Sequence, residues 1–270
     1  MLNNSPPLEQ STIHSVHPEV VSSIDILESE GVRTLHFGSD WVQGAMRVAR
    51  PWALELEYTR AMIFPLILCE DTPTRILLIG LGAASLLKYL YRHCPHAHLT
   101  VVEIDPRVVQ AARQFFRMPE DSKRITLVEG DGADFMGQVS ETYDLILVDG
   151  FDARARAGRL QGERFYRDCG RVLSTQGFLC ANFLTRQRGY RSALSAWGVI
   201  FSGRTLHFPT LDSGNGVVLA SAGPQGPWSL VELRARVLAW KKNHALDLGR
   251  ILTRIEQLQS GAGGMLRLGQ

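Results

Sequence analysis

The chain has 270 residues, of which 45% are apolar, and its 29 basic and 27 acidic residues leave a formal net charge of +2. A chain of this length can bury one large core with a small accessory domain beside it. The near-neutral charge argues against a nucleic-acid-binding protein, which needs a basic surface, and no apolar run reaches the length of about 18 residues that predicts a membrane span.

The first 70 residues differ in sequence pattern from the rest of the chain. Residues 1–20 lack the basic and apolar regions of a secretory signal, so we expect a disordered lead-in and a cytoplasmic protein. Residues 21–70 are predicted to form a small β-rich cap and a connecting helix. Apolar residues alternate on both sides of Glu30-Gly31, which predicts a hairpin; a third strand is expected at 41–48, and a helix from Pro51 to Leu66.

Residues 71–260 are predicted to form one α/β domain. The predicted strands lie at 76–79, 99–103, 125–128, 143–148 and 177–183, and helices are expected at 85–92, 106–116, 131–136, 163–173 and 190–201. A closing strand pair follows at 205–208 and 216–221, then a helical segment at 229–259 that breaks near 243–247, and a flexible tail at 261–270. Short apolar strands joined by crossover helices predict a doubly wound, mostly parallel, Rossmann-like sheet.

Glycines and acids follow four of the predicted strands in a regular order. They are Gly80 and Gly82 after the first strand, Glu103 at the end of the second, Asp131 and Gly132 after the third, and Asp149 at the end of the fourth. The carboxyl ends of parallel strands meet at one edge, where such sheets bind ligands. A dinucleotide-binding loop has the pattern Gly-x-Gly-x-x-Gly, but position 85, where the third glycine is expected, is Ser. The loop is therefore incomplete for binding a diphosphate, and the pattern favours a sulfonium nucleoside over a dinucleotide.

The order LLIGLGAAS, VVEIDP, LVEGDGADF, YDLILVDGFDA resembles the spermidine synthase-like family, the polyamine aminopropyltransferases, which are relatives of class I S-adenosylmethionine-dependent methyltransferases. The resemblance implies that Glu103 holds the ribose hydroxyls and Asp131 lies beside the adenine amino group. It also implies that Asp149 orients or deprotonates the attacking amine, that Gln43 contacts the donor, and that Tyr58 lines the amine channel.

The roles of two acids stay open on the residues alone. An amine must lose a proton before it attacks, and the Asp149 carboxylate could accept that proton, but an Asp after a strand is also a common helix cap or turn residue. Asp152 is equally consistent with a turn residue and with a second amine contact.

Two features depart from the family pattern. The family has an acid at the position of Ala83, where it repels a donor that keeps its carboxylate, so intact S-adenosylmethionine becomes admissible here. The loop after the fourth strand carries Arg154, Arg156 and Arg159, which either attract an anionic substrate group or simply face solvent.

The sequence therefore predicts a transferase that moves an aminopropyl group from a decarboxylated S-adenosylmethionine-type donor to a small amine. A methyltransferase using intact S-adenosylmethionine with another small acceptor, and a non-catalytic nucleoside-binding protein, are the alternatives. We expect a homodimer, no nucleic acid and no membrane as partners. We also expect no metal, because His93, His96 and His98 are read as part of an exposed connector.

Overall fold

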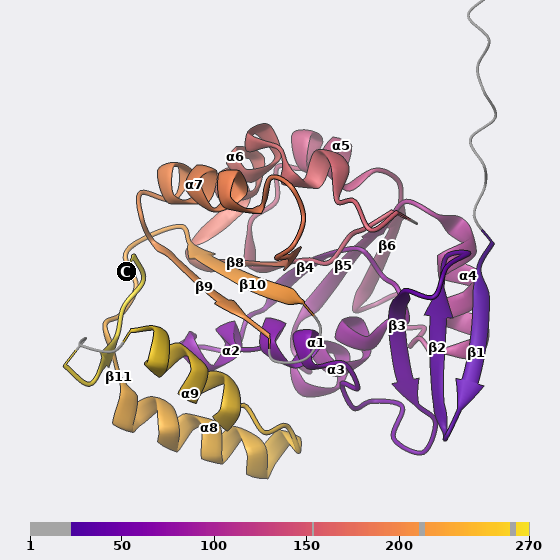
Figure 1. The fold of residues 1–270 in the computed structure, drawn as a ribbon, viewed down its shortest axis with the longest axis horizontal. Coiled ribbons are helices and arrows are strands. Elements are labelled where there is room, and N and C mark those ends of the chain that lie inside the picture. The colour runs from indigo at the N-terminus through magenta and orange to yellow at the C-terminus, as the bar shows by residue number, and fades with distance from the viewer. Residues whose placement is uncertain (1–22, 153, 211–213, 260–262, 270) are drawn as a thin grey trace, which may run out of the picture.

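The computed structural model describes residues 23–152, 154–210, 214–259 and 263–269, and the predicted lead-in at 1–20 lies outside this part of the chain. Figure 1 shows a central sheet with helices on both of its faces and a small separate sheet at one end. This arrangement confirms the predicted α/β fold with a β-rich cap.

The cap is an antiparallel sheet of β1 (Asp25–Ser29), β2 (Val32–His36) and β3 (Val42–Arg47). Its first turn is the predicted one: Glu30 and Gly31 both have positive φ angles, of 50° and 71°, as a tight two-residue hairpin requires. The cap stands beside the larger sheet (Figure 1), and so forms a wall next to the carboxyl ends of its strands.

The connecting helix begins later than predicted. Residues near Pro51 form turns, in which the Arg50 and Ala53 N–H groups bond to carbonyls three residues back, and Leu56 is still extended. Helix α1 therefore covers Glu57–Met62 and α2 covers Pro65–Leu68, so the predicted start at Pro51 is wrong. Proline suits a first helical position, but it fits a turn equally well, and here the turn prevails.

The central sheet has seven strands in the order β6-β5-β4-β7-β8-β10-β9. They are β4 (Arg75–Ile79), β5 (His98–Glu103), β6 (Ile125–Glu129), β7 (Tyr143–Val148), β8 (Leu173–Leu184), β9 (Thr205–Pro209) and β10 (Asn215–Ser221). The first five in the chain are parallel, and β10 lies antiparallel between β8 and β9. The strand order reverses direction at β4, which has β5 on one side and β7 on the other.

The helices cover both faces of this sheet. One group comprises α5 (Gly132–Gln138), α6 (Glu163–Val172) and α7 (Tyr190–Ile200); the other comprises α1, α2, α3 (Ser85–His93), α8 (Leu230–His244) and α9 (Gly249–Leu258), with α4 (Pro106–Phe115) near the cap (Figure 1). Alternate residues of β4 enter the two apolar cores, Ile76 and Leu78 on one face and Leu77 and Ile79 on the other. Within the described ranges, no helix is both long and apolar enough to cross a membrane.

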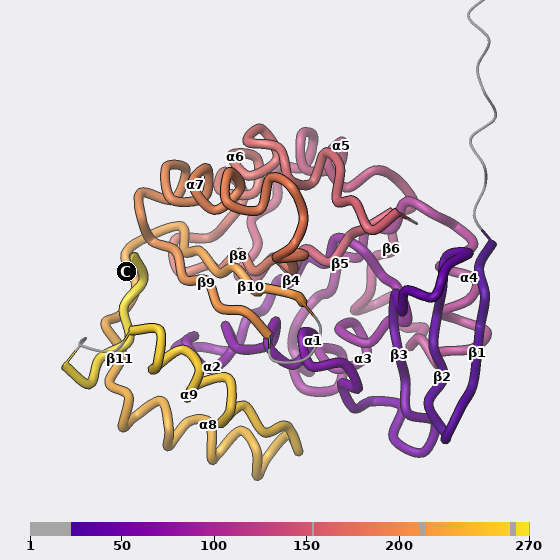
Figure 2. The backbone as a smooth tube through the Cα atoms, viewed as in Figure 1, coloured from indigo at the N-terminus to yellow at the C-terminus, as the bar shows by residue number. Residues whose placement is uncertain are grey.

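Of the predicted flexible tail at 261–270, the structure describes residues 263–269, and these contact the rest of the chain. Met265–Leu266 form β12, which pairs with β11 (Trp228–Ser229), and the Gly269 N–H bonds to the Thr205 carbonyl at 2.8 Å. Figure 2 traces this yellow segment back past β11. Leu266 is 1% exposed, and burial of its side chain stabilises this segment. The glycines of the segment were the reason for expecting a flexible tail.

Replacing Gly44 by Val should destabilise the chain. A Cβ at Gly44 would lie 2.7 Å from both the backbone nitrogen and the Cβ of Ala83, so β3 would be forced away from the glycine loop. We expect a loss of roughly 1–3 kcal/mol in the free energy of unfolding, measured by urea titration.

Gly198→Ala is the matched control, because a Cβ on that helical glycine meets nothing within 4 Å. It should be neutral or stabilising by up to about 1 kcal/mol, because alanine suits a helix better than glycine. Equal stability of the two variants would show that cap and sheet are not packed as described.

Candidate active site

A cavity of about 510 Å³ lies at the carboxyl ends of the parallel strands, where the strand order reverses. The cap and α1 form its opposite wall. All nine residues predicted for the site line this one cavity: Gln43, Tyr58, Gly80, Gly82, Glu103, Asp131, Gly132, Asp149 and Asp152. The structure thus brings the predicted positions together, as expected for a ligand site of a doubly wound sheet.

The glycine loop after β4 packs against the end of β7. Gly80 has a φ of 96°, and a Cβ there would overlap the carbonyl group of Asp149. Gly82 also has a positive φ, of 50°, and faces the Gln43 carbonyl of the cap. Only glycine allows this approach without strain, so the loop exposes backbone to whatever occupies the cavity.

The Glu103 carboxylate is fixed at the end of β5. One of its oxygens accepts a hydrogen bond from the Leu81 N–H at 2.9 Å, and the other accepts one from the Asp105 N–H at 3.0 Å. Burial raises the pKa of Glu103, and these backbone bonds oppose that rise. The Ile104 N–H gives the carboxylate a third backbone bond, so about one of its roughly four acceptor positions remains for a ribose hydroxyl.

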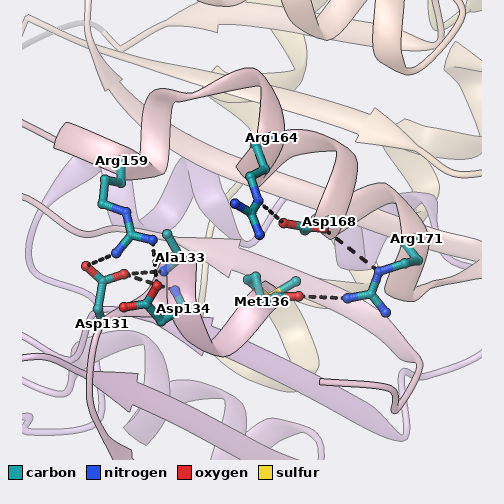
Figure 3. Close-up of polar contacts among 8 residues, drawn as sticks. All are labelled: Asp131, Ala133, Asp134, Met136, Arg159, Arg164, Asp168 and Arg171. Atoms are coloured by element: carbon teal, nitrogen blue, oxygen red, sulfur yellow. Dashed lines mark hydrogen bonds and ion pairs between the residues drawn. The ribbon is translucent and has the colours of Figure 1, made fainter. Parts of the chain in front are cut away.

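Asp131 begins helix α5 and joins it to the 3₁₀ helix η1 (Gly158–Gln161). Its Oδ1 accepts the N–H groups of Ala133 at 2.7 Å and Asp134 at 3.1 Å, while its Oδ2 lies 3.2 Å from Arg159, which also pairs with Asp134 (Figure 3). The carboxylate is therefore a helix cap and an ion-pair partner that also lines the cavity.

Asp149 is the acid held by neutral donors. The Asn182 amide donates a hydrogen bond to it at 2.9 Å, Asn215 in turn donates to Asn182 at 2.7 Å, and the Tyr58 hydroxyl bonds the same carboxylate. Burial raises the pKa of Asp149, and the two donors offset part of that rise. Within the described ranges it forms no ion pair, so a cationic ligand can approach it.

Asp152 organises the loop that follows β7. Its carboxylate accepts the backbone N–H groups of Arg154 and Arg156, both at 2.8 Å, and pairs with the Arg156 guanidinium at 2.7 Å. Between the two roles left open by the sequence, these contacts favour the turn residue.

The three loop arginines do not make the cavity basic. Arg156 and Arg159 line it, each paired with an acid, whereas Arg154 is exposed and is not part of the lining. Six carboxylates and two guanidinium groups line the cavity. Of the two alternatives left open for these arginines, attraction of an anionic substrate group therefore finds no support, and a cationic ligand fits the charge of the cavity better.

Ala83 is not among the residues that line the cavity. It is 2% exposed and packs against Gly44 of β3. Where the family has an acid, this chain therefore has a small, close-packed contact between the cap and the glycine loop. The repulsive charge is absent, as the sequence predicted, but the Ala83 side chain itself does not face a donor in the cavity.

Sequence reasoning missed Asn182 and Asn215. Asn182 lies within the apolar run of β8 and is 6% exposed, and a polar side chain at such a place signals a buried partner. Asn215 carried no comparable signal, because it stands between the two strands predicted at 205–208 and 216–221.

Two histidines of the predicted connector contact other side chains of the chain. His93 faces His244, with 3.0 Å between their Nδ1 atoms, and His98 bonds Thr126. Among the described residues there is no group of three or more His, Cys, Asp or Glu side chains that could hold a metal ion.

Comparison with known proteins points to one family. The family model for the spermine/spermidine synthase domain matches residues 56–184. The polyamine aminopropyltransferase of Chromobacterium violaceum is 33% identical over 92% of this chain and 95% of its own length, and that of Neisseria meningitidis serogroup A is 32% identical over 85% and 87%.

Two solved structures share the fold. A probable spermidine synthase from Corynebacterium glutamicum superposes with a TM-score of 0.69 at 20% identity, covering 89% of this chain and 91% of that one. Human methyltransferase-like protein 13 gives 0.63 at 22% identity, covering 70% and 93%. At these identities the likeness concerns the fold alone.

Asp149→Asn should stabilise the chain at neutral pH. Because the folded-state pKa of Asp149 is raised, the folded form holds its proton more tightly than the unfolded form does, so stability falls as pH rises through that window. The amide removes this penalty, and its advantage in urea titrations should shrink as pH falls toward the ordinary range of an aspartate.

Asp247→Asn is a control variant whose change in stability at neutral pH should have the opposite sign. Lys241 lowers the pKa of Asp247, so this carboxylate contributes stability at neutral pH that is lost as pH falls. The same sign for both variants would contradict the described environment of Asp149.

Proposed function

Since this chain belongs to the spermine/spermidine synthase family, we propose that it transfers an aminopropyl group from decarboxylated S-adenosylmethionine to a small amine. The observation that carries the proposal is the Asp149 carboxylate, desolvated, held by Asn182 and Tyr58, and open to the cavity at the end of β7.

The nucleoside of the donor would lie along the strand ends. Glu103 would accept hydrogen bonds from the ribose hydroxyls, Asp131 would lie near the adenine amino group, and the backbone of Gly80 and Gly82 would allow close contact. Gln43 would approach the donor from the cap. The shared cavity and the remaining acceptor position of Glu103 support these roles.

The charge of the cavity favours the decarboxylated donor. Intact S-adenosylmethionine would bring a carboxylate among six acids, and both guanidinium groups of the described lining are already paired. The decarboxylated donor carries only positive charges, which this lining attracts. Methyl transfer, which needs the intact donor, is therefore the weaker reading.

The chemistry requires a free amine next to an electrophilic carbon. The amine nitrogen attacks the propyl carbon bonded to sulfur; the N–C bond forms as the C–S bond breaks, and sulfur keeps the electron pair as a neutral thioether. The attacking nitrogen gives up its proton to Asp149, whose raised pKa makes it a stronger base than an exposed aspartate. The enzyme otherwise contributes alignment of the two reactants.

The state of Asp149 also argues against a non-catalytic protein. Desolvating a carboxylate costs stability, and a binding protein would gain nothing from leaving it without a cation. Here neutral donors hold the carboxylate, and in the described part of the chain no lysine or arginine is paired with it. The predicted homodimer stays a prediction, which light scattering of the purified protein would test.

Asp149→Ala should abolish turnover while keeping donor binding. We expect kcat/KM with decarboxylated S-adenosylmethionine and an amine to fall by about 10²–10⁴, the usual contribution of a general base. Calorimetric affinity for the thioether product, methylthioadenosine, should change by less than about threefold, because the nucleoside contacts remain.

Wild-type calorimetry with both donors accompanies this test. Tighter binding of the decarboxylated form supports the proposal; tighter binding of intact S-adenosylmethionine with methyl transfer to an acceptor would replace it. Asp247→Asn serves as the activity control, since it lies on the α8–α9 connection, outside the cavity lining.

A further inference from the structure

Two buried asparagines on neighbouring strands form a line of hydrogen bonds that ends at Asp149. Asn182 of β8 is 6% exposed and Asn215 of β10 is 7% exposed, and the two strands pair antiparallel. The Asn215 amide nitrogen donates to Oδ1 of Asn182 at 2.7 Å, and Nδ2 of Asn182 donates to Oδ1 of Asp149 at 2.9 Å. The environment of the carboxylate therefore depends on both amides.

The Asn182 amide can face Asp149 with either its nitrogen or its oxygen. An ionised carboxylate only accepts hydrogen bonds, so it is stabilised by the amide nitrogen and repelled by the amide oxygen. A protonated carboxyl group can instead donate to the amide oxygen. The orientation of this one amide thus decides which form of Asp149 is held better.

Asn215 binds the side of the Asn182 amide that faces away from Asp149. A buried amide oxygen without a partner is costly, so the Asn182 oxygen stays where the Asn215 nitrogen reaches it. The backbone fixes the position of Asn215, because its carbonyl accepts the Thr210 N–H at 2.9 Å and the Thr210 hydroxyl at 3.1 Å. These backbone bonds remain when the Asn215 side chain is replaced.

The other groups around Asp149 do not replace this contact. The Tyr58 hydroxyl of α1 bonds the carboxylate, and the Cys180 thiol of β8 lies within reach of its charge; both groups have raised pKa values and are neutral near pH 7. The glycine loop after β4 contributes no charged side chain. The other titratable groups of the cavity lining are Glu55, Glu57, Glu103, Asp131 and Asp152, together with Arg156 and Arg159, which pair with acids.

We infer that Asn215 is a positioning residue for the base: by binding the oxygen of the Asn182 amide, it keeps the amide nitrogen turned toward Asp149. The inference rests on the proposed function, because this orientation serves proton acceptance by Asp149. Asn215 also lines the cavity, so its effect on Asp149 has to be measured without a ligand.

Asn215→Leu removes the donor and keeps a side chain with the same branching. The Asn182 amide can then turn, and its oxygen faces Asp149 favourably only when Asp149 is protonated. The pKa of Asp149 should therefore rise by about 0.5–1, a roughly 3- to 10-fold change in its dissociation constant. Carbon-13 NMR of carboxyl-labelled aspartate in the purified, ligand-free protein measures it, and the Asp149 resonance is identified by its absence in Asp149→Asn. Asn215→Ala, which adds no bulk, should shift the pKa in the same direction.

Val218→Ala is the matched control on β10. Val218 is fully buried, and its side chain enters the apolar core that contains Trp197 of α7, so this variant loses packing without losing an amide contact. It should unfold at a lower urea concentration and keep the wild-type pKa of Asp149. An unchanged pKa in both Asn215 variants, or an equal rise in Val218→Ala, would overturn the inference.

Kinetic measurements separate this inference from the proposed function. If an amine is alkylated, the acidic limb of the pH profile of kcat/KM should move upward in Asn215→Leu by the same amount as the NMR pKa. If no amine is alkylated but the NMR pKa rises as expected, aminopropyl transfer fails and the role of Asn215 stands. A kcat/KM that falls equally at every pH, with an unmoved NMR pKa, would contradict a positioning role.

Discussion

The contact between the glycine loop after β4 and the end of β7 is the constraint on which the site depends. Gly80 can lie against the Asp149 carbonyl only because it has no Cβ, and the Asp149 N–H bonds the Ile79 carbonyl at 2.8 Å. The same loop donates the Leu81 N–H to Glu103. One close approach thus sets the positions of a donor-binding acid and of the proposed base.

Most of this arrangement could be predicted from the sequence because it follows from local rules. Apolar runs, glycine turns and terminal acids recur once per strand, and parallel strands bring their carboxyl ends to one edge. All nine predicted site residues therefore reached the same cavity. The start of α1 and the ordered C-terminal segment could not be predicted, because turn preference at Pro51 and burial of Leu266 depend on distant packing.

The sequence also could not predict which arginine neutralises which acid of the site. Arg156 and Arg159 stand three residues apart, yet one pairs with Asp152 on its own loop and the other with Asp131 at the start of α5. Asn182 was hidden in an apolar strand, although its amide is what holds Asp149. Residue types alone do not say which acid each cation meets, and those pairings decide how much negative charge a substrate encounters.

Asp149 and Asp152 show how two acids three residues apart acquire different chemistry. Asp149 is half-buried in the cavity wall and is held by an amide and a phenol; no cation compensates its charge in the described part of the chain, and burial raises its pKa. Asp152 is more exposed and accepts four N–H bonds, which hold its pKa below the ordinary value despite partial burial. A desolvated carboxylate without a cation, such as Asp149, is suited to accept a proton. A carboxylate whose acceptor positions are all filled, such as Asp152, instead holds its loop in one conformation. The environment, and not the side-chain type, therefore decides which aspartate serves as a base and which has a structural role.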